Sequence, residues 1–257
     1  MPFPLESLEQ MQGFFWVLVR VSIILFLLPI FGAKGVPTMW KVGVSIVMAM
    51  ILTPVVPMPR SFPETLPEMI LGILSEVVMG LLLSFGIRML FAAFQTAGQF
   101  MAFQMGFAMA RAMDPVTGTQ STVLSQFLYL FAVLIFFSID GHHQFISALA
   151  ASFHIVPLDS FSPNPALSQI LIKTSGQIFL VALKIAAPIM VALFLSHLCL
   201  GILARTVPQM NILMIGLPVN LFIGFIFFAM ILANVSPYMV DLFRGTAELF
   251  MGMLRLM

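Results

Sequence analysis

The sequence predicts an all-α membrane protein, and its composition and its long apolar runs carry that prediction. Hydrophobic residues make up 61% of the 257 residues, charged residues make up 8%, and the mean hydropathy is +1.10. A soluble domain carries about 25% charged residues, so this chain has too few polar groups to cover a globular surface. Apolar runs long enough to span a bilayer recur along it. The composition therefore excludes a soluble enzyme, a nucleic-acid-binding protein and a disordered protein.

The first two apolar runs are predicted to be membrane helices. A span needs about 20 apolar residues to cross about 30 Å of hydrocarbon. The first run covers residues 14–31 and is interrupted only by Arg20, and the second covers residues 42–56. Three prolines within residues 54–59 then predict irregular structure, because proline breaks helical hydrogen bonding. Since no Lys or Arg precedes Arg20, we expect the first run to remain in the mature protein rather than act as a cleaved signal.

Residues 69–110 form a long proline-free stretch whose only charges are Glu76 and Arg88. As one helix, its 42 residues would extend about 63 Å, twice the thickness of the hydrocarbon layer. The sequence leaves two alternatives, a turn near Arg88 or a continuous helix that leaves the hydrocarbon. Residues 111–118 are predicted to be a loop, because Asp-Pro followed by Gly is typical of turns.

The second half of the chain repeats the alternation of apolar runs and breaks. We expect a span over 121–139, an interfacial or re-entrant helix over 142–157, a loop over 160–165, a second overlong run over 166–204, a break over 205–209, a span over 212–235 and an amphipathic C-terminal segment. The loop with Lys34 and Lys41 should be cytoplasmic. Later loops mix charges of both signs, so the pattern defines no complete topology. Overlong helices with internal charges indicate packing against other proteins as well as lipid.

No motif for catalysis or nucleotide binding occurs in the sequence, and no basic run could hold a nucleic acid. We therefore expect no enzymatic activity, no cofactor and no contact with nucleic acid. Asp140, His142 and His143 are close enough in sequence to suggest a metal site. Adjacent histidines should point to different faces of a helix, however, and no fourth ligand lies at a suitable spacing. We predict no metal site and interpret these residues as interfacial polar groups that close a span.

Charges inside apolar runs are candidates for function, since each costs at least about 2.5 kcal/mol at a helix centre. They are Arg20, Glu76, Arg88, Lys173 and Lys184. Lys173 and Lys184 are three helical turns apart and share a face, whereas Glu76 and Arg88 diverge by about 120° and cannot pair within one helix. One interpretation is a proton or ion relay with Glu76 as the carrier. Ion pairing between helices or subunits is favoured, because one acid among four bases makes a poor relay.

Residues 98–113 combine two stripes that repeat every fourth residue. The small residues are Gly98, Ala102, Gly106 and Ala110, and the thioethers are Met101, Met105, Met109 and Met113. Small residues let another helix backbone approach closely in a membrane. Methionine adapts to varied shapes, so this helix could end in a deformable seal at a pore, next to the loop at Asp114 and Pro115. The pattern alone favours the alternative, ordinary packing in a methionine-rich protein.

Several collinear motifs resemble the FliR/SctT family of type III export proteins. They are Pro29-Ile-Phe-Gly-Ala-Lys-Gly-Val-Pro37 with Lys41-Val-Gly43, Phe91-Ala-Ala-Phe-Gln-Thr-Ala-Gly98 with Gln104-Met-Gly106 and Asp114-Pro115, Asp140-Gly-His142 with Ile146-Ser147 and Ser152-Phe153, and Leu200-Gly-Ile-Leu-Ala-Arg205 with Pro208-Gln209 and Ile215-Gly-Leu-Pro218. The resemblance covers essentially the whole chain, and overall similarity favours the flagellar over the injectisome branch.

The resemblance implies a single domain over residues 1–257 that acts as a structural and gating subunit of a flagellar export channel. It implies FliP-like, FliQ-like, FlhB-like and FlhA-like partners, a place in the bacterial inner membrane at the flagellar basal body, and unfolded flagellar subunits as cargo. One such chain completes a ring of FliP-like subunits. Its hydrophobic helical hairpins then sit in a conical assembly partly above the membrane, which would account for the overlong helices and the undefined topology.

The family's plug-like loop maps onto about residues 106–123, and this shifts the balance from packing towards gating. The implied gate residues are Met105, Gly106, Phe107, Met109, Arg111, Met113, Asp114 and Pro115. The methionines, with Phe103 and Phe107, would close around the moving chain, and Arg111 and Asp114 could latch the loop.

Two alternatives from other classes remain. A self-contained secondary transporter would use helices broken at Pro188 and Pro218, with Glu76 and the two lysines as binding groups, but no inverted repeat is visible in the sequence. An intramembrane enzyme lacks a nucleophile–base pair.

Overall fold

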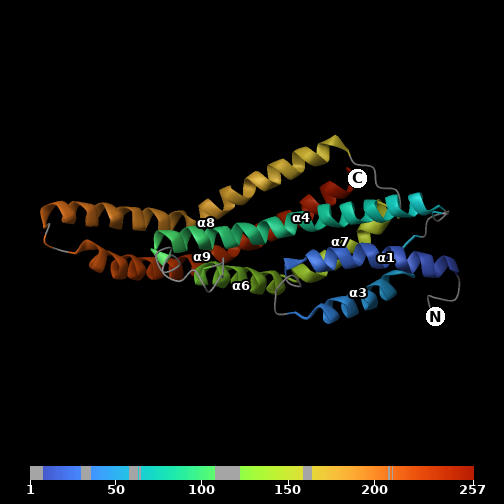
Figure 1. The fold of residues 1–257 in the computed structure, drawn as a ribbon, viewed down its shortest axis with the longest axis horizontal. Coiled ribbons are helices and arrows are strands. Elements are labelled where there is room, and N and C mark those ends of the chain that lie inside the picture. The colour runs from blue at the N-terminus through green and yellow to red at the C-terminus, as the bar shows by residue number, and fades with distance from the viewer. Residues whose placement is uncertain are drawn as a thin grey trace. The chain divides into compact units, whose positions relative to one another are not determined.

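The computed structural model describes residues 8–29, 36–57, 63, 65–107, 122–158, 164–207, 209 and 211–257. Within these residues the regular secondary structure consists of seven α-helices, and no strand occurs (Figure 1). The helices are α1 (Leu8–Leu27), α3 (Thr38–Leu52), α4 (Leu66–Gln104), α6 (Val123–Ser138), α7 (Gly141–Ile155), α8 (Pro165–Thr206) and α9 (Ile212–Leu254). The all-α class is confirmed.

Among the described residues, four helices are long and apolar enough to cross a membrane, and the number becomes five if α6 and α7 together form one broken span. α3 is apolar but has only 15 residues, which is too short for it to count as a membrane-spanning helix. It is followed by a turn at Thr53, whose backbone amide donates to the carbonyl of Ala49. That turn lies where the cluster of prolines predicts irregular structure.

α4 is one continuous helix of 39 residues, about 58 Å long, so the alternative of a turn near Arg88 is wrong. Nothing in the stretch breaks helical hydrogen bonding, because no proline occurs between Pro67 and the end of the helix at Gln104. The helix ends just before Gly106, whose φ of +91° lies in the left-handed region that glycine adopts without strain.

α8 and α9 have 42 and 43 residues, about 63 and 65 Å. α8 contains Pro188, and α9 contains Pro218 and Pro237. The expected separation of a 212–235 span from an amphipathic C-terminal segment is therefore wrong, since α9 passes through Pro237 without a break. A single proline removes one backbone hydrogen bond, and in an apolar environment every remaining bond favours helix over an open chain.

The chain divides into two compact units that share three helices. The first unit contains Met1–Met89, Asp140–Thr174 and Phe243–Met257, and the second contains Leu90–Ile139 and Ser175–Leu242. The first unit thus holds α1, α3, α7 and the start of α4, and the second holds α6 and the greater parts of α8 and α9.

The first unit is built around α1, which packs against α3. Trp16, Val17 and Val21 on α1 are buried, together with Met79 on α4 and Leu149 on α7. The α1 and α4 backbones approach closely because α4 has Gly80 at the contact. A methyl group placed on Gly80 would lie 2.7 Å from the Cγ2 atom of Ile23.

The second unit has an aromatic centre. The ring of Phe91 on α4 lies 5.6 Å from that of Tyr129 and 6.0 Å from that of Phe136, both on α6. These edge-on and tilted arrangements match the preferred geometry of aromatic pairs. Ile189 and Leu193 on α8 are fully buried in the same unit.

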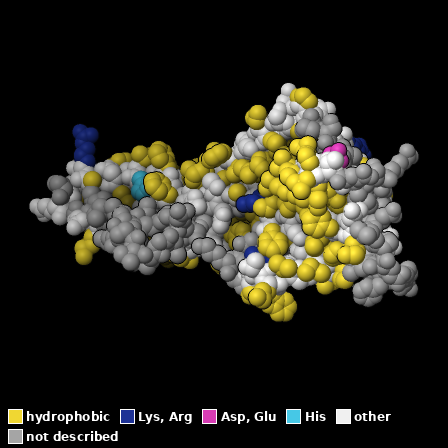
Figure 2. All heavy atoms as spheres, turned by 45° about the vertical axis from the view of Figure 1, so that its right-hand side comes forward, with side chains coloured by type: hydrophobic (Ala, Val, Ile, Leu, Met, Phe, Trp, Pro, Cys, Tyr) yellow, Lys and Arg dark blue, Asp and Glu magenta, His cyan; other side chains and the backbone are white. Residues whose placement is uncertain are grey.

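Much apolar side-chain surface stays exposed on the isolated chain. Figure 2 shows hydrophobic side chains spread over the drawn face, with few charged groups among them. On α8 alone, large apolar side chains such as Phe179, Val191 and Phe194 are more than half exposed. Patches of this extent mark surfaces that lipid or other proteins cover.

Candidate functional site

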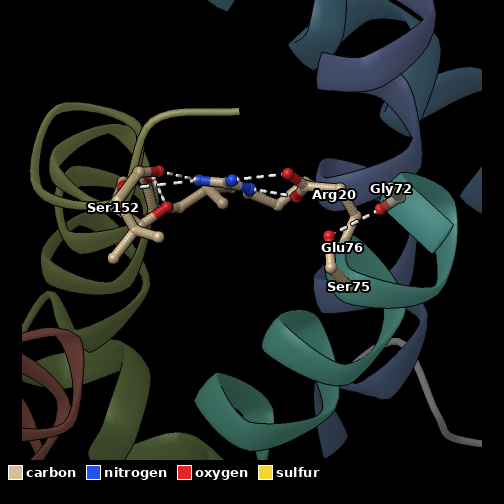
Figure 3. A network of polar contacts seen from close by, with 7 residues as sticks. Arg20, Gly72, Ser75, Glu76 and Ser152 are labelled. Atoms are coloured by element: carbon tan, nitrogen blue, oxygen red, sulfur yellow. Dashed lines mark hydrogen bonds and ion pairs between the residues drawn. The ribbon is translucent and has the colours of Figure 1, made fainter. Parts of the chain in front are cut away.

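The first unit contains a fully buried arginine whose guanidinium group joins three helices (Figure 3). Arg20 on α1 donates from Nη2 to Oε1 of Glu76 on α4 at 2.7 Å, and its Nε donates to the other carboxylate oxygen. The exposed fraction of the Glu76 side chain is 2%. This two-pronged geometry is the strongest form of an arginine–carboxylate pair.

The same guanidinium group closes the C-terminal end of α7. Nη1 of Arg20 donates to the carbonyl oxygen of Val156 at 2.9 Å and to that of Ser152 at 3.3 Å. The last carbonyls of a helix lack partners within the helix and carry partial negative charge, so a cation is well placed there. The guanidinium carbon also lies 4.5 Å from the ring centroid of Phe153, within the range of a cation–π contact. We call Arg20, Glu76, Ser152, Phe153 and Val156 the arginine clamp.

In the arginine clamp, two of the charges inside apolar runs form an ion pair between helices, which is the arrangement that the sequence favoured over a proton relay. A charge buried without a partner costs several kcal/mol, whereas a paired and hydrogen-bonded one is tolerated. Both carboxylate oxygens of Glu76 accept hydrogen bonds from Arg20. Neither oxygen is left without a donor, so the geometry does not support a proton carrier at Glu76.

The remaining internal charges lie on helix surfaces. Arg88 on α4, and Lys173 and Lys184 on α8, are exposed. Their large exposed neighbours on α8 include Ile172 and Leu183. The structure therefore brings together only Arg20 and Glu76 among the five predicted charges, and leaves three cations on apolar surface.

The small-residue stripe on α4 meets another helix at Gly98. A methyl group on Gly98 would lie 2.4 Å from Cα of Ser125 and 2.8 Å from its backbone nitrogen, both on α6. These are backbone atoms, which cannot rotate away. Ala102 is fully buried, and Gly106 faces Leu217 of α9. Gly98 and Gly106 thus allow close approach to α6 and α9, and the part of the whole stripe in helix packing stays a prediction.

The two described members of the methionine stripe, Met101 and Met105, are fully buried inside the second unit. The thioether of Met105 fills the space beside Gly224 of α9, where a methyl group would lie 2.7 Å from its sulfur. These two side chains therefore pack within the chain and do not line an open surface. Phe103, by contrast, is 70% exposed.

Met105, Gly106 and Phe107 directly follow α4 and contact α9, since the ring of Phe107 lies 6.5 Å from that of Phe225. The other predicted gate and packing residues lie outside the described residues. They are Met109, Ala110, Arg111, Met113, Asp114 and Pro115. Their part in gating stays a prediction.

A polar cluster between α8 and α9 was not predicted from the sequence. Ser196 donates to Oδ1 of Asn220 at 2.8 Å, and Nδ2 of Asn220 lies 2.8 Å from Nε2 of His197. The sequence does contain a signal for this cluster, which is the presence of uncharged polar residues within long apolar helices. Such groups commonly hydrogen-bond across helices in membranes. Their spacing of 24 residues gave no indication of which would pair.

The expectation that His142 and His143 point to different faces is wrong. Their ring centroids lie 4.1 Å apart, and Nδ1 of His143 lies 3.3 Å from Oδ1 of Asp140. Both histidines lie in the first turn of α7, where side chains lean towards the helix N-terminus. The two Cβ atoms still diverge around the helix, so it is the side-chain rotamers that bring the rings together beside Asp140.

Apolar helices long enough to cross a bilayer, with the fully buried charges paired to each other, define an integral membrane protein of the all-helical class. The sequence matches the family described as bacterial export proteins, family 1, over residues 11–246. The chain belongs to this family.

Similar proteins include three named flagellar biosynthetic protein FliR. That of Bacillus subtilis is 32% identical over 252 residues, which cover 97% of each chain. That of Pectobacterium carotovorum is 30% identical over 97% of this chain and 95% of its own. That of Escherichia coli is 30% identical over 93% of this chain and 91% of its own.

Proposed function

We propose that this chain is a structural and gating subunit of the flagellar type III export channel in the bacterial inner membrane, at the flagellar basal body. The observation that supports this most strongly is the match to FliR proteins over nearly the whole length of both chains. A match of this extent includes every described helix. The fold is consistent with that role, because four apolar helices can anchor the subunit in a membrane.

The chain is proposed to work inside a hetero-oligomer with FliP-like, FliQ-like, FlhB-like and FlhA-like subunits. Exposed apolar side chains along α8 and α9 support this, since a subunit surface of this kind requires a covering. The exposed cations Arg88, Lys173 and Lys184 add a second reason. Each is costly when it faces lipid, and a carboxylate on a neighbouring subunit would offset that cost.

The gate is proposed to include Met105, Gly106 and Phe107 together with Met109, Arg111, Met113, Asp114 and Pro115. The first three contact α9, and these contacts hold the start of the segment that follows. Because Met105 is buried, the methionines suited to contacting a moving polypeptide are Met109 and Met113. Unfolded flagellar subunits would pass through the assembly, while soft side chains around them limit ion leakage.

The subunit is proposed to act without catalysis or a cofactor of its own. The sequence contains no nucleotide-binding motif, so the energy for transport would come from partner subunits. A self-contained transporter is not favoured, because its proposed carrier, Glu76, is held by Arg20. Its proposed helix breaks at Pro188 and Pro218 lie inside continuous helices.

Replacing residues 110–120 with a flexible Gly/Ser linker tests the gate. We expect ion conductance of the reconstituted channel complex to rise, since a linker without bulky side chains cannot seal a pore. A control replaces the half-buried Lys41 of α3 with Gln, far along the sequence from the loop. Conductance equal to that of the control would contradict the gating role, and assembly of the variant complex would be checked on the same sample.

A further inference from the structure

We propose that Asp140, His142 and His143 form a binding site for a divalent transition-metal ion of the zinc type. The three side chains each offer one donor atom, and these atoms all lie within 4.8 Å of one another. The site lies within four consecutive residues of the first unit, so its geometry depends on one local turn. It does not depend on the proposed role in export.

The backbone at this turn aims the carboxylate at the histidines. Asp140 occupies the N-cap position of α7 in a left-handed conformation, with φ 54° and ψ 29°. Its backbone carbonyl accepts hydrogen bonds from the amides of His143 and Gln144, at 3.0 and 3.2 Å. An N-cap aspartate normally uses its side chain to accept from the first helical amides. Here the side chain makes no capping bond, and its Oδ1 instead lies 3.3 Å from Nδ1 of His143.

The two imidazole rings complete the donor set. Their centroids are 4.1 Å apart, with an interplanar angle of 39°. Each ring restricts the other, and both lie on the side of the turn that Asp140 faces. A convergent set of donors on three side chains is better organised for binding than three independent surface groups, since less conformational entropy is lost on binding.

The chemistry of the donors selects the ion. Two imidazole nitrogens and one carboxylate oxygen suit Zn²⁺, Co²⁺, Ni²⁺ or Cu²⁺. Ca²⁺ and Mg²⁺ prefer sets made of oxygen atoms only. The carboxylate also supplies one negative charge, which offsets the partial positive charge at the N-terminus of α7. Three protein ligands leave one tetrahedral position for water or for a group from a neighbouring molecule.

The side chains need only a small movement to reach bonding distance. Ligands about 2.0–2.1 Å from a tetrahedral zinc lie about 3.4 Å from each other. The donor atoms all lie within 4.8 Å of one another, so no pair must close by more than about 1.4 Å. The side chains of Asp140 and His143 are 73% and 70% exposed and can make that adjustment. A bound ion would tie together the first turn of α7, the helix whose other end supplies carbonyl groups to the arginine clamp.

The test measures Co²⁺ and Zn²⁺ binding to the full chain in detergent, together with any subunits that co-purify. The purification tag must contain no histidine. Cobalt absorption reports the ligand geometry, and calorimetry with Zn²⁺ reports affinity and stoichiometry. We expect one ion per chain, with affinity lowered by about tenfold or more in Asp140→Asn and His143→Gln. His154→Gln, an exposed histidine near the other end of α7, is the matched control and should bind as the wild type does.

A second measurement separates site binding from binding elsewhere. Zn²⁺ should raise the thermal midpoint of the wild type and of His154→Gln, because an ion that binds the folded state stabilises it. The double variant His142→Gln/His143→Gln should show no such rise. Wild-type affinity retained in Asp140→Asn and His143→Gln, an equal loss in His154→Gln, or no binding at all would overturn the proposal.

Discussion

Removing Arg20 is the sharpest perturbation of the arginine clamp. In Arg20→Met the apolar replacement fills part of the same space on α1 but leaves the Glu76 carboxylate buried without its cation. The carbonyl groups of Ser152 and Val156 lose the donor that reaches them from α1, and Phe153 loses its cation–π partner. Three helices, α1, α4 and α7, therefore lose their common polar contact.

The expected loss of stability follows from these contacts. Removing one partner of a buried ion pair costs about 3–5 kcal/mol, because the remaining charge stays desolvated. The pair itself contributes less, since two well-packed apolar side chains in its place are often neutral or stabilising. We therefore expect Arg20→Met to lower the free energy of unfolding by about 3–5 kcal/mol, and Arg20→Met/Glu76→Leu to lower it by less than the single variant does.

Unfolding in mixed micelles with increasing SDS measures these differences. Trp16 is buried one helical turn before Arg20, so its fluorescence reports on the α1 contact. Arg88→Met is the matched control, because it removes an exposed arginine from α4 and should change stability by about 0.5 kcal/mol or less. If Arg20→Met behaves like Arg88→Met, or if the double variant loses the sum of the single losses, the clamp is not a coupled unit.

Two further predictions concern helix packing in the second unit. Gly98→Leu should destabilise by about 1–3 kcal/mol or more, because its side chain meets the backbone of Ser125. In Gly43→Leu, where the space is open, the same SDS titration should detect little change, and equal losses in both would contradict close packing at Gly98. Asn220→Leu should lower the free energy of unfolding by about 1–3 kcal/mol, since it removes two polar contacts between α8 and α9 and leaves Ser196 without its acceptor. An unchanged unfolding midpoint in that variant would show that the cluster does not hold the helices together.

The helices were predictable because apolar runs of known length signal them directly. Every expected span has a described helix, and α7 is found where a shorter helix was expected. The helix boundaries at prolines were less predictable. A local rule indicates where proline weakens a helix, but tertiary packing decides whether the helix continues, as it does through Pro237.

The sequence could not predict which groups pair with the buried charges. Arg20 and Glu76 were each identified as costly, yet they lie 56 residues apart, and the carbonyl groups that share Arg20 lie at least 132 residues further along the chain. No local pattern links such positions. The convergence of His142 and His143 was missed for another reason, since the rule for helix faces places Cβ atoms and does not specify the rotamers that bring two rings together.

Native mass spectrometry of the tagged protein, co-expressed with its neighbouring genes and extracted in detergent, shows whether this chain is a subunit of an export gate. An export-gate subunit should appear in one large hetero-oligomer that contains a single copy of this chain. The exposed apolar surfaces of α8 and α9 would be covered in that complex. A monomer or a small homo-oligomer without other subunits would contradict a role in the export gate.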